Sequence, residues 1–296
     1  QKMHDNTIEL VEKKKVFALF QNFGSVGITA TLPYVKKTGI PLVCPIAPAD
    51  SLRYPPIPNI FNIKNSFKTE IDALIQFLVE KKGLKKIALF RTEADASASF
   101  AWRPADLALS ARGLKLVAKE GVERTAKNVD GALNKLMASK PEAVIVTTVG
   151  AVTMELVRKW AATKTPVVFA LFSPAIGNNF AVDVKDLNYE IFISQSFPFL
   201  EPNSFPIVKE YIEETKAANL VPGAGGLEGY VCAALITEVF KKTGVELTRE
   251  NFLKTFDSMH EVDIGGLKYS FSPTQHQGSE KSFIIQAKNG NLVPAQ

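Results

Sequence analysis

The sequence predicts an α/β protein with two lobes, each a mainly parallel sheet flanked by helices. Short apolar runs rich in Val, Ile, Leu and Phe alternate with helical patterns over most of the chain, which is typical of parallel strands covered on both faces. From about residue 191 this alternation gives way to successive helices, and strand patterns return only near the C-terminus. A chain that leaves an α/β layer and re-enters it indicates two lobes connected by more than one crossover.

Strands and helices are expected in regular alternation over the first two thirds of the chain. The first helix carries Ile8 and Val11, and the next carries Ile28, Leu32 and Val35 at helical spacing before it stops at Gly39. Strands are expected at VFALF (16–20), IPLVC (40–44), IFNI (60–63), KIALF (86–90), LKLVA (114–118), AVIVTT (143–148) and PVVFALF (166–172). Further helices are expected around residues 71–79, 107–109, 133–137 and 154–160.

The last third has a different order. We expect a strand at IFISQSF (191–197), helices over 207–218, 227–242 and 250–259, and strands in GGLKYSF (265–271) and SFIIQAKNGNLV (282–293), the latter with an Asn-Gly turn. Candidate crossovers lie at 63–65, 195–198 and 266–270. They assign residues 1–63 and 197–266 to lobe 1, and residues 64–196 and 267–296 to lobe 2.

Composition excludes several classes of protein. With 296 residues, 46% hydrophobic and 22% charged, the chain is neither disordered, collagen-like nor a disulfide scaffold. No apolar run approaches the roughly 20 residues that a membrane-spanning helix needs. The net charge is +5, but only seven of the 35 basic residues are Arg, and Lys pairs such as Lys81-Lys82 suit helix ends. Because Arg is preferred for reading phosphates and bases, we expect no nucleic-acid partner.

Two cysteines are present, Cys44 and Cys232, each in an apolar stretch and without metal-ligand spacing. We expect two buried free thiols and no metal site. A single long-range disulfide is the alternative, which the sequence leaves open. The opening QKMHDNTIELVEKKK has the pattern of an amphipathic helix and lacks the apolar core of a secretion signal.

Catalytic signatures are missing from the sequence, which contains no GxSxG, GxxxxGK[ST] or HExxH motif. The three histidines, His4, His260 and His276, are expected to be solvated surface side chains. The sequence therefore predicts neither an enzyme nor a cofactor.

Two loops carry the best local signals for a ligand. The loop with Gly24 and Ser25 follows a strand and opens a helix, so its N–H groups and the Ser25 hydroxyl fit a carboxylate. A tight turn without a ligand explains it equally well. The loop over residues 44–50 also follows a strand, and ligands bind at the carboxyl ends of parallel strands. In the segment 94–102, Phe100 and Trp102 fit either core packing or the wall of an apolar site.

Several segments together resemble a known family. VFALFQNFGSVGITATLPYVKKTGIPLVCPIAPADSLR and PNIFNI are similar to the first lobe of periplasmic type I solute-binding proteins of the branched-chain amino acid (LivJ/LivK-like) ABC transporter class. LKLVAKEGVERTAKNVDGALNKLMASKPEAVIV resembles the second lobe, GGLEGYVCAALITEVF a late helix and DIGGLKYSFSPTQHQGS the closing hinge segment. Such segments cover nearly the whole chain.

The resemblance implies a fold of two α/β lobes joined by three crossovers and a function in transport. Members are not enzymes; they close on a small solute and deliver it to an ABC permease. It also implies a periplasmic location, or an extracellular tethered one in a Gram-positive cell, and a monomer. Members normally begin with a strand, helix and strand ahead of the point where this sequence starts, so we expect lobe 1 to lack that part.

The resemblance also suggests site residues. It places the carboxylate of the ligand on Gly24, Ser25, Ala47 and Ala49, and the opposite wall on Ala96, Ser97, Gly150 and Ser173, with Phe197 near a crossover. In amino-acid-binding members an acidic residue of lobe 2 binds the ammonium, but that position falls near Ser173. Because a buried ammonium without a carboxylate costs several kcal/mol, we expect a carboxylate or another polar or aromatic solute rather than an α-amino acid. A ligand-sensing domain of a signalling system with the same fold is the alternative.

Overall fold

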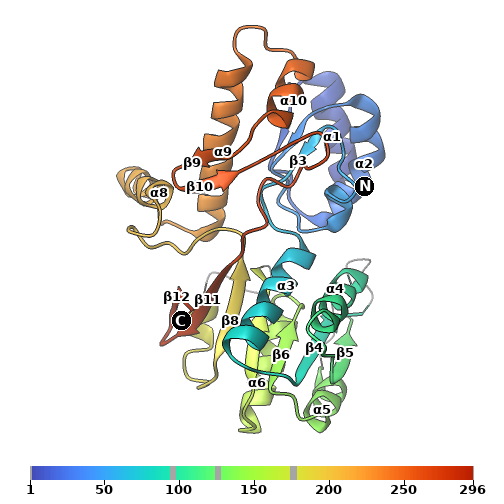
Figure 1. The fold of residues 1–296 in the computed structure, drawn as a ribbon, viewed down its shortest axis with the longest axis vertical. Coiled ribbons are helices and arrows are strands. Elements are labelled where there is room, and N and C mark those ends of the chain that lie inside the picture. Colours follow the sequence, from blue (N-terminus) through green and yellow to red (C-terminus); the bar gives the residue numbers. More distant parts are fainter. Residues whose placement is uncertain (1, 94–97, 124–127, 174–178, 296) are drawn as a thin grey trace. The chain divides into compact units, whose positions relative to one another are not determined.

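The chain folds into two compact units. The computed structural model describes residues 2–93, 98–123, 128–173 and 179–295, with backbone alone over 98–102. Unit 1 contains residues 1–66 and 200–281, and unit 2 contains residues 67–199 and 282–296 (Figure 1). The first two boundaries fall three residues after those predicted at 63/64 and 196/197. The third falls fifteen residues after the predicted 266/267, because the hairpin over 262–269 stays with unit 1.

Unit 2 is built on a seven-stranded sheet of order β12-β11-β8-β7-β6-β4-β5. Neighbouring strands from β5 to β8 run parallel, while β11 is antiparallel to both β8 and β12. Its strands are β4 (Ile87–Thr92), β5 (Ala118–Val122), β6 (Ala143–Val146), β7 (Val168–Leu171), β8 (Ile191–Gln195), β11 (Phe283–Lys288) and β12 (Asn291–Pro294). Its helices are α3 (Phe67–Gln76), continued by the wider turn η3 (Phe77–Lys81), α4 (Ala98–Ser110), α5 (Asp130–Ala138), α6 (Ala151–Ala162) and α7 (Phe180–Asp183).

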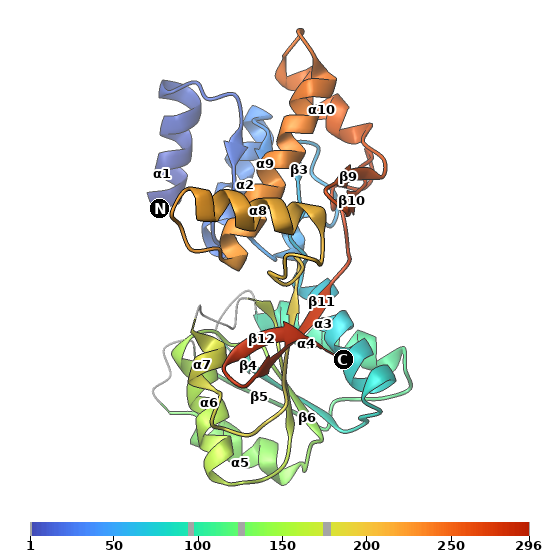
Figure 2. The same cartoon turned by 90° about the vertical axis from the view of Figure 1, so that its left-hand side faces the viewer.

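Helices cover both faces of the unit 2 sheet, as the apolar strand patterns predict. Ile87 and Leu89 of β4 pack against α3 and α4, whereas Ala88 and Phe90 pack on the other face with α5, α6 and α7. Figure 2 shows these two helical layers with the strands between them. Successive strand side chains point to opposite faces, so a continuous apolar run such as Ile87–Phe90 fills two cores at once.

One strand of unit 2 was predicted at the wrong residues. The pattern LKLVA indicates a strand over 114–118, but β5 begins at Ala118 and pairs with β4 from Ala88 onward. Leu114 and Leu116 instead pack against the core between the sheet and α3 and α4. Since β5 lies at an edge of the sheet, its residues need less apolar character than a central strand.

Unit 1 holds a three-stranded parallel sheet of order β1-β2-β3. Its strands are β1 (Leu19–Phe20), β2 (Leu42–Val43) and β3 (Ile60–Phe61), with a separate antiparallel hairpin of β9 (Val262–Ile264) and β10 (Leu267–Tyr269). Its helices are α1 (Lys2–Ile8), continued by η1 (Glu9–Lys13), α2 (Ser25–Thr38), the single turn η2 (Asp50–Leu52), α8 (Pro206–Ala217), α9 (Ala224–Thr243) and α10 (Arg249–Asp257). Among the described residues, no helix is both long and apolar enough to cross a membrane.

The sheet of unit 1 also separates two cores. Ile28, Leu32 and Val35 of α2 pack with Leu19 and Leu42 in an aliphatic core. A second core is aromatic: the Phe61 ring of β3 is stacked on Phe256 of α10 with centroids 4.3 Å apart, and Phe252 and Phe271 surround this pair. The carboxyl ends of β1, β2 and β3 therefore emerge from a well-packed sheet, and each continues into a loop.

Candidate ligand-binding loops

The first candidate loop connects β1 to α2. Gly24 caps α2 with φ 98° and ψ 118°, a backbone conformation that residues other than glycine rarely adopt. Its N–H donates to Ile46 O at 3.1 Å, so this donor of the predicted site is already used. The first helical bond runs from the Ile28 N–H to Gly24 O, which leaves the N–H groups at 25–27 without a backbone acceptor in the described structure. These donors and the Ser25 hydroxyl are the groups that an anion would meet.

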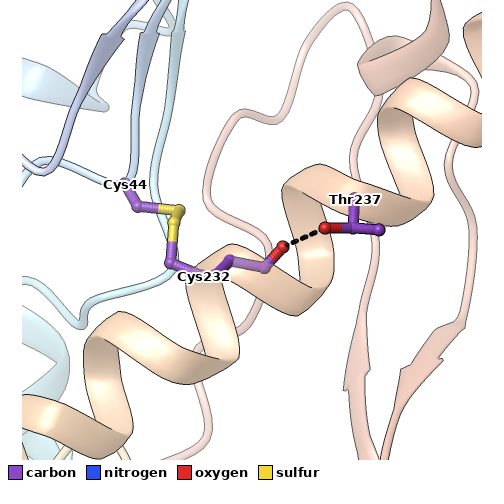
Figure 3. The surroundings of a disulfide bond; sticks show 4 residues. Cys44, Cys232 and Thr237 are labelled. Carbon is purple, nitrogen blue, oxygen red and sulfur yellow. Dashed lines mark hydrogen bonds between the residues drawn. A yellow bond between two sulfur atoms is a disulfide. The ribbon is translucent and has the colours of Figure 1, made fainter.

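The second loop, residues 44–53, is fastened at its start by a disulfide. Cys44 is bonded to Cys232 of α9, with Cα atoms 6.4 Å apart (Figure 3). The expectation of two free thiols is therefore wrong. Both half-cystines are buried as predicted, but 188 residues separate them, and their proximity arises only when α9 packs beside the end of β2.

The backbone groups of Ala47 and Ala49 are largely occupied within this loop. The Ala47 N–H donates to Pro45 O at 2.9 Å, and Pro48 has no N–H. Both alanine carbonyls accept from the Arg53 guanidinium, at 3.0 Å for Ala47 and 2.6 Å for Ala49. The described structure gives the Ala49 N–H no acceptor. Of the two residues predicted to contact a ligand in this loop, only Ala49 therefore keeps a backbone N–H that can donate to a ligand.

In unit 2, Gly150 takes the place that Gly24 has in unit 1. It follows β6 and caps α6 with φ 61° and ψ −131°, again a glycine conformation. The first α6 bond is donated by Met154 to Gly150 O, so the N–H groups at 151–153 have no backbone acceptor among the described residues. Two predicted site residues thus play the same structural role, one in each unit.

Ser173, at the end of β7, is held by a carboxylate that sequence analysis missed. Glu70 of α3 is 0% exposed. Its Oε2 accepts from the Ser173 N–H at 2.7 Å and the Ser194 hydroxyl at 3.0 Å, and its Oε1 accepts from the Ser173 hydroxyl at 2.7 Å. Ser173 therefore has no donor left for a ligand, although its hydroxyl oxygen can still accept. One signal for Glu70 exists in the sequence: it lies four residues before Leu74, on the buried face of α3.

The remaining predicted contacts are less informative. Phe197 follows β8 and is 5% exposed. Ala96 and Ser97 lie outside the described residues, as does the start of the predicted aromatic segment. No group of three His, Cys, Asp or Glu side chains in the described chain is arranged to hold a metal ion.

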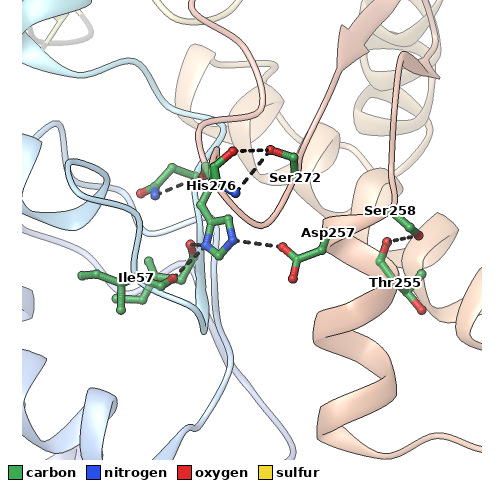
Figure 4. A network of polar contacts seen from close by, with 9 residues as sticks. Ile57, Thr255, Asp257, Ser258, Ser272 and His276 are labelled. Carbon is green, nitrogen blue, oxygen red and sulfur yellow. Dashed lines mark hydrogen bonds and ion pairs between the residues drawn. The ribbon is translucent and has the colours of Figure 1, made fainter.

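His276 contradicts the expectation of a solvated imidazole. It is 2% exposed and stacks on Phe61 with ring centroids 4.2 Å apart. Nδ1 lies 2.7 Å from Ile57 O and Nε2 lies 3.0 Å from the Asp257 carboxylate (Figure 4). A carbonyl oxygen and a carboxylate oxygen therefore lie within hydrogen-bonding distance of the two ring nitrogens. His276 joins the loop before β3 to the end of α10 and acts within the fold of unit 1.

A buried ion pair lies near the first boundary of unit 1. Lys64 Nζ is 3.1 Å from Glu228 Oε2, and both side chains are about nine-tenths buried. Burial, and next the negative charge of Glu228, raise the pKa of the Tyr269 hydroxyl well above its usual value. This pair joins the segment after β3 to α9, the same helix to which the disulfide joins the end of β2.

The family of the chain follows from comparison with known proteins. The family model described as periplasmic binding protein matches residues 4–291. The chain belongs to this family. The two α/β units agree with the two-lobed type I fold that the sequence predicts. No curated protein matches this periplasmic binding protein.

Solved structures share the fold of this periplasmic binding protein at low sequence identity. A possible leucine/isoleucine/valine-binding protein from Rhodopirellula baltica has a TM-score of 0.88 at 20% identity, over 100% of this chain and 81% of that one. A branched-chain amino acid ABC transporter protein from Thermus thermophilus with bound valine has a TM-score of 0.83 at 16% identity, over 99% and 80%. A solute-binding protein from R. palustris in complex with benzoate has a TM-score of 0.82 at 16% identity, over 99% and 80%.

Proposed function

We propose that this periplasmic binding protein captures a small carboxylate, or another polar or aromatic solute, between its two units and delivers it to an ABC importer. The observation that carries the proposal is the family match over residues 4–291. Structures of the same fold hold small solutes with a carboxylate: the amino acid valine in the T. thermophilus protein and the amine-free acid benzoate in the R. palustris protein. The proposal includes hinge closure on the solute, a monomer, a permease partner and no catalytic step.

In this proposal, unit 1 binds the anionic end of the solute. The N–H groups at 25–27, the Ser25 hydroxyl and the Ala49 N–H are the donors that we assign to the solute, since the described structure gives none of these N–H groups a backbone acceptor. The positive end of the α2 dipole adds a favourable contribution of about 0.3–1 kcal/mol for a negative charge placed there. Gly24 and Ala47 support this arrangement through their backbone rather than by touching the solute.

Unit 2 supplies the opposite wall, to which we assign Ala96, Ser97, Gly150, Ser173 and Phe197. This set contains no carboxylate to neutralise an ammonium group, and the nearby Glu70 carboxylate is fully buried and already accepts three hydrogen bonds. This supports a solute without a free α-amino group. A hydroxyl or amide N–H on the solute would suit the Ser173 oxygen, which can only accept.

The disulfide supports the proposed location. Disulfide bonds persist in oxidising compartments such as the periplasm and the cell exterior, and they are rare in the cytosol. The Cys44–Cys232 bond is therefore what we expect of a protein that works in the periplasm, or tethered outside a Gram-positive cell.

Isothermal titration calorimetry tests the proposal. A panel of aliphatic and aromatic carboxylates is titrated into the wild type, Ser25→Ala and Ser258→Ala, a control at an exposed hydroxyl of unit 1. We expect at least one carboxylate to bind at one per chain, with at least about tenfold weaker binding in Ser25→Ala, since a hydrogen bond to a charged group contributes about 1.5–3 kcal/mol. Absence of binding by every acid overturns the function; unchanged affinity in Ser25→Ala overturns the site.

A further inference from the structure

Arg53 makes a set of contacts that the solute-binding role leaves unexplained. It directly follows the η2 turn, is 1% exposed and donates four hydrogen bonds to neutral oxygen atoms. Nη1 donates to Ala49 O at 2.6 Å, and Nη2 donates to Ala47 O and to Lys64 O, both at 3.0 Å. Nε donates to Gln277 Oε1 at 2.7 Å. A cation is buried here, and at least four of its contacts serve to orient backbone and amide groups.

These contacts join three segments of unit 1. Ala47 and Ala49 belong to the second candidate loop. Lys64 lies just before the chain leaves unit 1 for the first time, at 66/67, and Gln277 precedes its last departure, at 281/282. Gln277 closes the network, because its Nε2 donates to Lys64 O at 3.1 Å and to Ser279 O at 2.7 Å. One guanidinium thus links the loop to two of the three segments that connect the units.

The geometry of the guanidinium determines what the loop can offer to a solute. Its N–H groups form a rigid planar fork, whereas a lysine ammonium at this place would be a single point charge on a flexible chain. The guanidinium donates to the carbonyls of Ala47 and Ala49, which therefore point toward the buried side chain of Arg53. The Ala47 N–H donates to Pro45 O, while the Ala49 N–H has no backbone acceptor in the described structure.

We propose that Arg53 is a positioning residue: it fixes loop 44–53 in the conformation that binds the solute and couples this loop to the connecting segments around Lys64 and Gln277. Arg53 acts through the backbone of the loop and never touches the solute. The coupling to solute rests on the proposed function, while the fixing of the loop does not.

Hydrogen exchange measured by mass spectrometry tests the fixing of the loop in the full chain without any ligand. The variants are Arg53→Lys, which keeps the charge, and Arg249→Lys as a matched control. Arg249 also donates to two backbone carbonyls of unit 1, Val16 O and Phe17 O. In Arg53→Lys we expect exchange about tenfold faster in peptides covering 44–53, 62–66 and 275–279, the change that loss of one hydrogen bond from a charged group produces. Peptides of α9 and α10 keep their wild-type rates.

A second variant separates Arg53 from its neighbour in the network. Gln277→Ala removes one acceptor and leaves the two loop carbonyls on Arg53, so faster exchange is expected at 275–279 and not at 44–53. The inference is overturned if Arg53→Lys accelerates exchange uniformly over unit 1, if Arg249→Lys gives the same pattern in loop 44–53, or if Gln277→Ala loosens the loop as much as Arg53→Lys does.

Calorimetry with benzoate and valine tests the coupling to solute. Where benzoate or valine binds the wild type, Arg53→Lys is expected to weaken the affinity for that probe about tenfold, while Arg249→Lys leaves the affinity unchanged. Equal affinities in all three proteins overturn the positioning role in binding. Where neither probe binds, the exchange pattern alone decides whether Arg53 fixes the loop. Failure of the proposed function and failure of this inference are therefore distinguishable.

Discussion

Unit 1 and unit 2 hold their candidate loops with buried charges of opposite sign. In unit 1 the Arg53 guanidinium can only donate, and it donates hydrogen bonds to the carbonyls of Ala47 and Ala49. In unit 2 the Glu70 carboxylate accepts hydrogen bonds from the N–H and the hydroxyl of Ser173. Arg53 therefore binds acceptors of loop 44–53 and leaves the Ala49 N–H as a donor, whereas Glu70 binds donors of Ser173 and leaves its hydroxyl oxygen as an acceptor. The difference teaches that the sign of each buried charge sets which groups of the segment beside it remain for a ligand.

The units are alike in their glycine-capped helices and differ in covalent support. Gly24 and Gly150 both place a helix N-terminus at the carboxyl end of a strand. The single disulfide that two cysteines allow lies within unit 1. Unit 1 has a sheet of only three short strands, whereas unit 2 has seven. The following predictions test this comparison.

Removal of the disulfide is expected to have the largest effect, and only on unit 1. Cys44→Ser with Cys232→Ser lowers its stability by about 2–5 kcal/mol, because the unfolded chain regains the freedom that a long cross-link removes. Urea unfolding followed by hydrogen exchange in each unit measures the effect. Equal loss of protection in β4 and β6 of unit 2 would contradict the assignment of the bond to unit 1 alone.

Loss of the buried carboxylate is expected to affect unit 2 next most strongly. Glu70→Ala leaves the N–H and hydroxyl of Ser173 and the hydroxyl of Ser194 without this acceptor, which costs about 3 kcal/mol. Ser194→Ala removes one neutral donor and serves as the matched control at about 1 kcal/mol. Chemical denaturation measures both variants. A Glu70→Ala effect no larger than that of Ser194→Ala would show that the carboxylate does not anchor Ser173.

The two glycine caps are expected to respond alike. An added Cβ meets nothing within 4 Å at either Gly24 or Gly150. Alanine at these positions is therefore destabilising only through its positive φ, which lowers the free energy of unfolding by about 1–3 kcal/mol. Gly131, in open space within α5 and without a positive φ, is the control. Thermal unfolding of the three alanine variants measures the difference. A stabilised Gly24→Ala or Gly150→Ala would refute the shared role of the two caps.

The smallest expected effects depend on pH and have opposite directions in the two units. In unit 1, burial raises the pKa of Tyr269 above its usual 10.0, so its contribution to stability is lost as pH rises above about 10, where the unfolded chain ionises first. In unit 2, the N–H groups of Lys86 and then Lys85 lower the pKa of Glu142 below 4.5. Its contribution is lost as pH falls below about 4.5.

Unfolding free energies measured against pH test this pair. Tyr269→Phe should reduce the change in unfolding free energy with pH above about 10, the alkaline limb. Glu142→Gln should reduce the change below about pH 4.5, the acid limb, and neither substitution should alter the other limb. If either substitution leaves its own limb unaltered, the corresponding group does not titrate differently in the folded and unfolded chain.

Sequence reasoning reached the fold and the turn at Gly24 because both depend on local patterns. Continuous apolar runs predict buried parallel strands, and a glycine between a strand and a helix predicts the turn at Gly24, whereas Gly150 was named only through the family resemblance and its capping role was not predicted. The anchoring charges were missed because their partners are distant: Arg53 bonds Gln277, 224 residues away, and Glu70 bonds Ser173, 103 residues away. The burial of His276 beside Phe61, 215 positions earlier in the chain, was missed for the same reason.

Calorimetry on matched pairs of solutes tests the central claim most directly. Valine is compared with 3-methylbutanoate, and phenylalanine with 3-phenylpropanoate, because the members of each pair differ only by the α-ammonium group. Unit 1 offers N–H donors to the carboxylate of the solute, and the Glu70 carboxylate of unit 2 already accepts three hydrogen bonds from the protein. The amine-free acid of at least one pair should therefore bind at one per chain and more tightly than its amino acid. Tighter binding of valine or phenylalanine than of its partner, or no binding by either acid, would contradict the account.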